Sequence, residues 1–203
     1  MCIRDSTTTS APAGDTHEQG TTYTDAGATA VDNIDGDITD KIVTLNPVDS
    51  SVAGTYTVTY NVSDAAGNAA DEVKREVVVS DTQVPVITLL GDPIVFVEVG
   101  NAYVEAGATA ADIADGDLTS SIVTVNPVNS SVVGTYTVTY NVSDAAGNAA
   151  SEVTRTVTVV DTTAPVITLI GPSSVTHELG TSYVDAGATA ADIADGDLTS
   201  SIV

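Results

Sequence analysis

The sequence predicts an all-β fold made of tandem immunoglobulin-like β-sandwich repeats, each about 80 residues long. The first reason is internal repetition: residues 54–70 recur letter for letter as residues 134–150, 80 positions later. The second is a period of two among the apolar residues of the best-defined segments, which is the pattern of a half-buried strand. The third is composition, because Thr, Val, Ala, Asp and Gly dominate and no segment has the period of an amphipathic helix.

The same period predicts the module boundaries. Residues 103–123 recur as residues 183–203 with one change, and the segment DTQVP that begins at Asp81 returns as DTTAP at Asp161. The chain therefore reads as a piece of a longer protein, in four parts. They are a leader that fits no part of the repeat and is expected to be non-native or disordered (1–16), a module without a recognisable first strand (17–80), a complete module (81–160) and a truncated module (161–203).

The complete module divides into short apolar segments separated by Gly, Pro, Asn and Asp. Strands of this kind, with turn residues at roughly every 8–12 positions, are typical of a β-sandwich. The expected strands are residues 86–90, 94–99, 103–111, 121–125, 135–142 and 153–159. The linker at residues 81–85 contains a proline and no glycine, which predicts a stiff connection.

The last two expected strands alternate most clearly, and their inward face predicts the core of the module. The predicted core residues are Tyr136, Val138, Tyr140, Val142, Val157 and Val159. Arg155 falls on the same face, which predicts a position near an edge of the sheet, since arginine is rarely buried without a partner.

The charge balance limits the partners that the chain can have. The sequence holds 28 acidic and 5 basic residues, a formal net charge of −23. Nucleic acid and anionic membranes need a basic surface, so we expect neither partner. No apolar run reaches the roughly 20 residues that a membrane-spanning helix needs, so no membrane insertion is expected. The one cysteine, Cys2, lies in the leader, and no disulfide framework is therefore predicted.

Three blocks of the repeat carry a family resemblance: DTTAPVITLIG, GTSYVDAGATAADIADGDLT and GTYTVTYNVSDAAGNAA. Together they resemble the bacterial Ig-like repeat of the type found in a pesticidal crystal protein, and they are similar to hyalin-type repeats and to Ig-like modules of large bacterial adhesins. The resemblance covers nearly all of residues 17–203. It implies an Ig-like sandwich in a secreted or surface-anchored bacterial protein, located outside the cell or at its surface, without catalytic activity. Related arrays bind calcium between modules.

The loop DIADGD is the first candidate for metal binding. It holds Asp112, Asp115 and Asp117, with Gly116 for the bend, and it recurs at residues 192–197 and, as DNIDGD, at residues 32–37. Ca²⁺ takes six to eight oxygen ligands from carboxylates, carbonyls and Asn side chains, which such a loop supplies. The alternative is a plain turn, because Asp-Gly is a common turn dipeptide and Asp bonds its own backbone.

The loop SDAAGN is the second candidate, with Asp144 and Asn148. The strand after it must run toward the C-terminal end of the module, so the loop itself lies at the N-terminal end, where Asp81 of the linker arrives. The candidate Ca²⁺ ligands are thus Asp81, Asp112, Asp115, Asp117, Asp144 and Asn148. The alternative of turn residues on an acidic, solubilising surface stays open.

Nothing in the sequence predicts an enzyme. His17 and His177 share a repeat position that Val97 occupies in the complete module, which indicates a strand side chain rather than a ligand. Two functions remain: a structural stalk whose partners are the neighbouring modules, and an accessory module that binds carbohydrate or a host protein, the surface ligand being unknown. The second needs exposed aromatic residues. An exposed Tyr103 beside apolar groups would favour it, so its burial separates the two.

Overall fold

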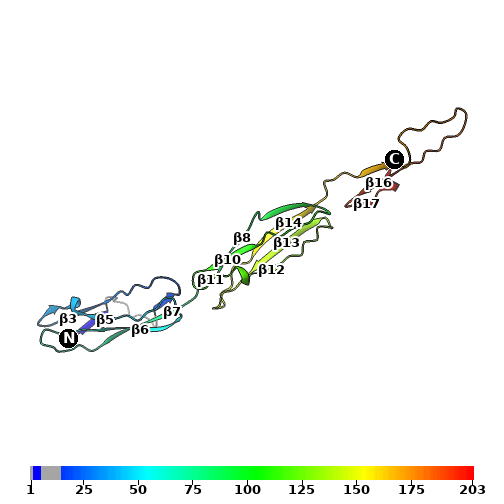
Figure 1. Cartoon of the computed structure of the whole chain (residues 1–203). Helices are drawn as coiled ribbons and strands as arrows, with labels where there is room; N and C mark the ends of the chain where they lie inside the picture. Colours follow the sequence, from blue (N-terminus) through cyan, green and yellow to red (C-terminus); the bar gives the residue numbers. More distant parts are fainter. Residues whose placement is uncertain (1, 6–14) are drawn as a thin grey trace. The chain divides into compact units, whose positions relative to one another are not determined.

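The computed structural model describes residues 2–5 and 15–203, which form β-strands, turns and single turns of 3-10 helix (Figure 1). The predicted all-β fold is confirmed. Contacts between Cα atoms divide the chain into two compact units. The first comprises Met1–Val86, Ala110–Ser120 and Ser143–Ala150, and the second comprises Ile87–Thr109, Ser121–Val142 and Ser151–Val203. Within the described residues, no helix is long and apolar enough to cross a membrane.

The first module, in the first unit, has two sheets. The three-stranded sheet has the order β1-β3-β4, with β1 at Cys2–Asp5, β3 at Ala28–Asp32 and β4 at Gly36–Asp37. The four-stranded sheet has the order β2-β7-β6-β5, with β2 at Asp15–Glu18, β7 at Val73–Ser80, β6 at Gly54–Asn61 and β5 at Val43–Leu45. A single turn of 3-10 helix, η1 at Thr39–Lys41, follows β4. The pairing of β2 with β7 is parallel, and the other pairings are antiparallel.

The core of the first module lies between these sheets. Val58 and Tyr60 of β6 and Val77 and Val79 of β7 are buried against one another, and Ala28 of the facing sheet packs on them. A second buried cluster consists of Ala30, Ile38 and Val62. Burial of alternate side chains from a strand is the main stabilising contribution, about 1.5–3 kcal/mol for each large apolar side chain that leaves water.

The complete module repeats this topology. Its three-stranded sheet has the order β11-β10-β8, with β11 at Gly116–Asp117, β10 at Ala108–Asp112 and β8 at Val86–Leu89. Its four-stranded sheet, in the second unit, has the order β12-β13-β14-β9, with β12 at Val123–Val125, β13 at Gly134–Asn141, β14 at Val153–Val160 and β9 at Ile94–Glu98. A 3-10 turn, η2 at Thr119–Ser121, occupies the start of the expected strand 121–125.

The truncated module, also in the second unit, has one sheet. Its order is β15-β16-β17, with β15 at Val166–Leu169, β16 at Ala188–Asp192 and β17 at Gly196–Asp197, followed by η3 at Thr199–Ser201. The register of β15 on β16 runs from Val166 opposite Ala191 to Leu169 opposite Ala188.

The predicted core of the complete module is largely confirmed. Five of the six residues are buried, with at most 5% of their surface exposed: Val138, Tyr140, Val142, Val157 and Val159. Tyr136 is only half-buried, and its hydroxyl donates a hydrogen bond to the carbonyl of Val132 at 2.9 Å.

Two expectations are wrong. Arg155 does not lie near an edge: it is 1% exposed, on a strand that pairs with β13 on one side and with β9 on the other. The leader is not wholly without structure either. Residues 2–5 form β1, which pairs with β3 and gives the first module a first strand, in the place that β15 takes on β16. Residues 15 and 16 of the leader, which the sequence predicts to be non-native or disordered, belong to β2, and its residues 1 and 6–14 lie outside the described residues.

Candidate metal centre

Three of the predicted ligands meet in the first unit. One carboxylate oxygen each of Asp81, Asp112 and Asp144 lies within 4.8 Å of the other two. Asp81 directly follows β7, Asp112 is the last residue of β10, and Asp144 lies in the hairpin loop between β13 and β14. Three segments far apart in the sequence therefore supply one acidic cluster, as the hairpin geometry predicts for Asp81 and Asp144.

Local hydrogen bonds fix the carboxylate of Asp112. Its Oδ1 accepts from the backbone N–H of Ala114 at 2.7 Å and from that of Asp115 at 3.2 Å. These bonds form an Asx turn, in which an Asp side chain replaces a backbone acceptor. Gly116 completes the bend with φ of 74°, a conformation that a residue with a Cβ rarely adopts.

The hairpin loop fixes Asp144 in a similar way. The Oδ1 of Asp144 accepts from the backbone N–H of Asn148 at 2.7 Å, and its Oδ2 accepts from the Asn148 amide at 2.9 Å. The same amide also donates to the backbone carbonyl of Asp81 at 3.3 Å. Asn148 therefore connects the hairpin loop to the linker.

The linker residue Asp81 is the unsatisfied member of the cluster. Its Oδ1 is buried and has no hydrogen-bond partner among the described residues. The next residue is held from another side, because the Glu18 carboxylate accepts from the backbone N–H of Thr82 at 3.0 Å and from its hydroxyl at 2.5 Å. A buried carboxylate oxygen without a donor or a cation is costly, so this atom needs a partner.

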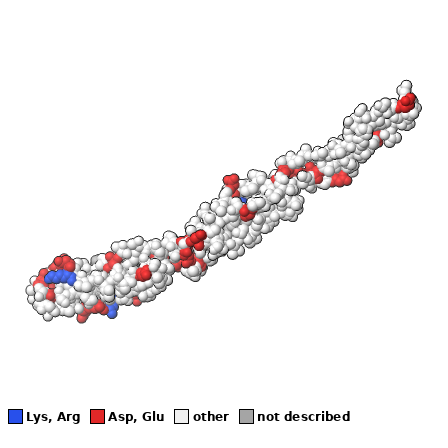
Figure 2. Space-filling model, in the orientation of Figure 1, with Lys and Arg blue, Asp and Glu red and all other residues white. Residues whose placement is uncertain are grey.

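The electrostatics of the cluster also favour a bound cation. Burial raises the pKa of Asp81, and the negative charges of Asp112 and Asp144 raise it further. Burial also acts to raise the pKa of Asp144, but the hydrogen bonds from Asn148 outweigh it and leave that pKa below its ordinary value. At neutral pH the cluster therefore concentrates negative charge, which a divalent cation would offset. Acidic side chains recur along the visible face of the molecule and basic ones are few (Figure 2).

The other three predicted ligands support the cluster and do not join it. The Oδ2 of Asp115 accepts from the backbone N–H of Ala145 at 2.6 Å, and the Oδ1 of Asp117 accepts from that of Thr119 at 2.9 Å. Asn148 donates its side-chain amide, as described above. All three side chains are engaged in holding loops.

The neighbouring modules repeat parts of the arrangement. In the first module Asp32 and Asp64 make the same loop hydrogen bonds and line a common hollow, and the position equivalent to Asp81 is Met1, outside the described residues. In the truncated module Asp161 and Asp192, the equivalents of Asp81 and Asp112, cluster with Asp195 within 4.8 Å. These side chains are more exposed than those of the complete module.

The structure also contains a buried ion pair between Arg155 and Glu105. The alternation of apolar and polar residues does not predict this pair. The first module has the same pair in Arg75 and Asp25. The sequence does hold one indication of it, because two of only five basic residues occupy one repeat position. Tyr103 contacts this ion pair: it is half-buried, and its hydroxyl donates a hydrogen bond to the Glu105 carboxylate. It is therefore not the exposed aromatic residue that a ligand-binding face needs.

Known proteins resemble this chain over part of their length. Hyalin from Strongylocentrotus purpuratus is 37% identical over 145 residues, which are 68% of this chain and 12% of hyalin. The pesticidal crystal protein Cry22Aa from Bacillus thuringiensis is 32% identical over 138 residues, 64% of this chain and 18% of that protein. A solved lipoprotein from Bacteroides thetaiotaomicron is 31% identical, with 39% of each chain covered and a TM-score of 0.36.

The expected resemblance to this repeat type is confirmed by the family comparison as well. The model of the family described as "Bacterial surface protein, Ig-like domain" matches residues 13–79 and 87–159, more than half of the chain. The two matched segments follow the first module and the complete module. The chain belongs to the bacterial surface protein Ig-like domain family.

Proposed function

We propose that this chain is a non-catalytic stalk region of a large secreted or surface-anchored bacterial protein of the adhesin type. We also propose that Ca²⁺ bound by Asp81, Asp112 and Asp144 fixes the linker to the loops of the complete module. Membership of a surface-protein family supports the first part, and so does near-identical repetition, since a spacer needs only repeated, rigid modules. The half-buried Tyr103 supports a structural role over ligand binding.

One observation carries the calcium proposal. Three carboxylates from separate segments converge within 4.8 Å, and one of them presents a buried oxygen without a hydrogen-bond donor. Ca²⁺ accepts irregular sets of six to eight oxygens at about 2.3–2.6 Å, so carboxylates and water molecules together would complete its shell. A role in solubility alone would let these side chains point separately into water.

Binding here would act as a cross-link. The ion would join Asp81, the linker residue that follows the first module, to two loops of the complete module, and only the folded arrangement offers all three carboxylates. It would therefore stabilise the folded state by mass action. The Asx turn at Asp112 and the hydrogen bonds from Asn148 to Asp144 would hold two ligands in place before the ion arrives, which lowers the entropic cost of binding.

A calorimetric titration of the full chain with Ca²⁺ tests the proposal, with Asp112→Asn as the key variant. Asp117→Asn is the matched control, because Asp117 lies in the same loop and outside the cluster. We expect Asp112→Asn to weaken one class of Ca²⁺ sites at least about tenfold, and the control to change the affinity by less than about threefold. The site as proposed does not exist if both variants titrate like the original chain.

A further inference from the structure

One turn of the first module lies directly against the complete module. This turn, residues 18–21, follows β2, and its Gly20 contacts Ile113 in the DIADGD loop. A Cβ atom on Gly20 would lie 2.7 Å from the carbonyl oxygen of Ile113, a separation that such atoms essentially never reach. Both residues belong to the first unit. We name residues 18–21 and the equivalent residues 98–101 the junction turns.

The second junction turn repeats this close approach. Gly100 follows β9, and a Cβ atom on it would lie 2.7 Å from Cγ2 of Ile193, the equivalent of Ile113. Both of these residues belong to the second unit. By contrast, Gly36 has φ of 74°, yet a Cβ atom there would meet nothing within 4 Å. The close approach is therefore a property of the junction turns and not of every glycine with positive φ.

Hydrogen bonds within its own module fix the shape of each junction turn. The backbone N–H of Thr21 donates to the carbonyl of Glu18 at 3.3 Å, and Gly20 between them has φ of 80°, as at the third residue of a type II turn. The N–H of Gly20 donates to the carbonyl of Ser50 at 2.8 Å. The N–H of Gly100 makes the equivalent bond, also at 2.8 Å. The surface that receives the isoleucine is thus formed by the module that carries the turn.

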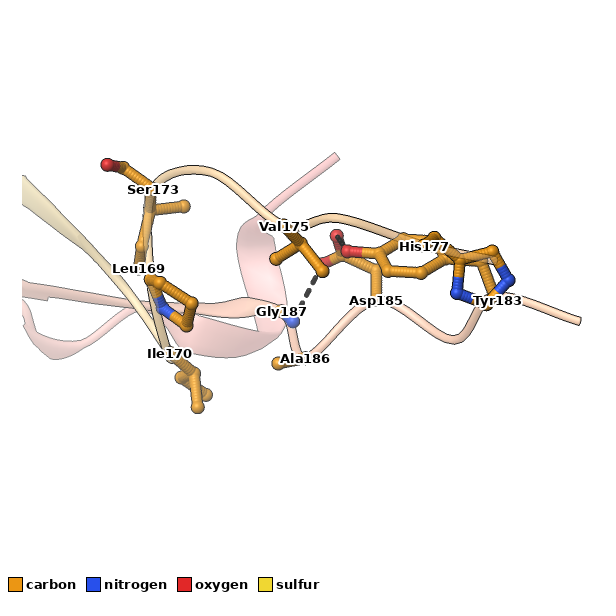
Figure 3. A pocket seen from close by; sticks show the side chains of 10 residues that line it. Leu169, Ile170, Ser173, Val175, His177, Tyr183, Asp185, Ala186 and Gly187 are labelled. Atoms are coloured by element: carbon orange, nitrogen blue, oxygen red, sulfur yellow. Dashed lines mark hydrogen bonds between the residues drawn. The ribbon is translucent and has the colours of Figure 1, made fainter. Parts of the chain in front are cut away.

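A histidine braces this turn from the side of the strand. Nε2 of His17 lies 3.1 Å from the hydroxyl of Thr21, and its ring meets the ring of Tyr23 edge-on, with 5.2 Å between the centroids. In the truncated module His177 and Tyr183 repeat this packing at 5.4 Å, and Figure 3 shows the two rings beside each other. The histidine therefore acts as a strand side chain that supports the turn.

The first residue of each junction turn holds the linker. The carboxylate of Glu98 accepts from the backbone N–H groups of Thr162 and Thr163 at 2.8 and 3.0 Å, and from their hydroxyls at 2.7 and 2.8 Å. Glu18 binds the N–H and the hydroxyl of Thr82 in the same way. One turn therefore binds the linker through its glutamate and contacts the next module through its glycine.

We propose that the junction turn is the docking surface for the following module of the chain, and that it restrains the angle between consecutive modules without calcium. Its partner is the DIADGD loop, whose isoleucine rests on the glycine of the turn. Domains joined by a linker move relative to one another unless contacts between them prevent it. The junction turn supplies such contacts through residues that are not part of the metal centre.

The test is the distribution of distances between two spin labels, measured by double electron–electron resonance in the presence of a chelator. The labels are placed on Thr57→Cys and Thr137→Cys, which are exposed positions of β6 and β13, in a full chain that carries Cys2→Ser. We expect a narrow distribution. Gly20→Ala should at least about double its width, because the added Cβ displaces the loop from the turn. Gly36→Ala, a glycine of similar φ with open space around it, should leave the width unchanged.

A second pair of variants keeps the test decisive if Gly20→Ala does not fold. Ile113→Ala removes the side chain that rests on the turn and should broaden the distribution. Ile34→Ala is its control, because Ile34 lies in the corresponding loop of the first module and is 88% exposed. An unchanged width for Ile113→Ala, or for a folded Gly20→Ala, would overturn the proposal.

Calcium separates this proposal from the metal centre. The original chain should give a narrow distribution in chelator, and added Ca²⁺ should not be needed to produce it. A distribution that is broad in chelator and becomes narrow only in Ca²⁺ would overturn the role of the junction turn and would support the metal centre instead.

Discussion

The carboxylate of Asp115 accepts a hydrogen bond of 2.6 Å from the backbone N–H of Ala145, 30 residues further along the chain. This bond joins the loop that presents Asp112 to the hairpin loop that presents Asp144. The first module has the equivalent bond of 2.8 Å between Asp35 and Ala65. The two acidic loops are therefore tied together by a residue that does not itself join the metal cluster.

The first prediction concerns this tie. Replacing Asp115 with Asn should weaken calcium binding by roughly threefold to tenfold, because a neutral amide is a weaker acceptor and the two loops lose part of their preorganisation. The measurement is calorimetric titration of the full chain. Asp35→Asn makes the same change in the first module and should leave the affinity of the cluster unaltered, so equal effects of the two variants would contradict this role.

The second prediction concerns the core of the complete module. Val138 is fully buried on β13, and Val138→Ala should lower the free energy of unfolding by about 1–3 kcal/mol through lost burial and a cavity. Urea unfolding of the full chain measures this change. The exposed neighbour Thr137 offers the control, since Thr137→Ala should stay within about 0.5 kcal/mol. If Val138→Ala also changed the free energy of unfolding by less than about 0.5 kcal/mol, the core would lie on the other face of the strand.

The third prediction concerns the ion pair of Arg155 and Glu105. Arg155→Met leaves a carboxylate that is 13% exposed without its cation, which should cost about 3–5 kcal/mol. Adding Glu105→Gln to that variant should recover part of the loss, because the uncompensated charge is gone. A double-mutant cycle in urea reports this coupling. Purely additive effects would show that the two side chains do not depend on each other.

The fourth prediction concerns acid stability of the first module. Burial acts to raise the pKa of Asp25, but the hydrogen bond from Tyr60 and the charge of Arg75 outweigh it and leave the pKa lowered. A carboxylate with a lowered folded-state pKa stabilises the fold above its unfolded pKa of about 4, and this contribution disappears as the pH falls through the folded value.

The urea concentration at the unfolding midpoint of the first module should therefore decrease as the pH is lowered below about 4. Asp25→Asn should make this decrease smaller. Asp49→Asn is a comparison on an exposed turn, where the lowered pKa comes from Ser51 and no buried arginine is involved. If Asp25→Asn leaves the pH dependence as steep as that of the original chain, other carboxylates must account for the loss.

The repeat period and the alternation of side chains were enough to predict the fold class and most of the core. They could not predict the place of Arg155, because a period of two identifies the face of a strand and says nothing about the order of strands. The strand of Arg155 lies inside its sheet because β9, some 60 residues earlier, pairs with it in parallel. Its acceptors are backbone carbonyls, which every residue type carries, so no sequence motif marks them.

The candidate metal centre was predicted in part for a similar reason. Chain direction through a hairpin was sufficient to bring Asp144 to Asp81. The spacing within DIADGD could not distinguish Asp112 from Asp115 and Asp117, because the direction of each carboxylate depends on which backbone N–H it accepts. The leader strand was missed because backbone pairing at the edge of a sheet places little demand on sequence.

Calcium at the linker is most directly tested by thermal unfolding of the full chain in millimolar Ca²⁺ and in chelator. We expect Ca²⁺ to raise the midpoint of the first transition by at least about 4 °C, since ligand at 100 times its dissociation constant adds about 2.7 kcal/mol. Asp112→Asn should abolish that rise, and Asp117→Asn should keep it. A midpoint that does not change between calcium and chelator would contradict the proposed site, and the acidity of the chain would then serve solubility alone.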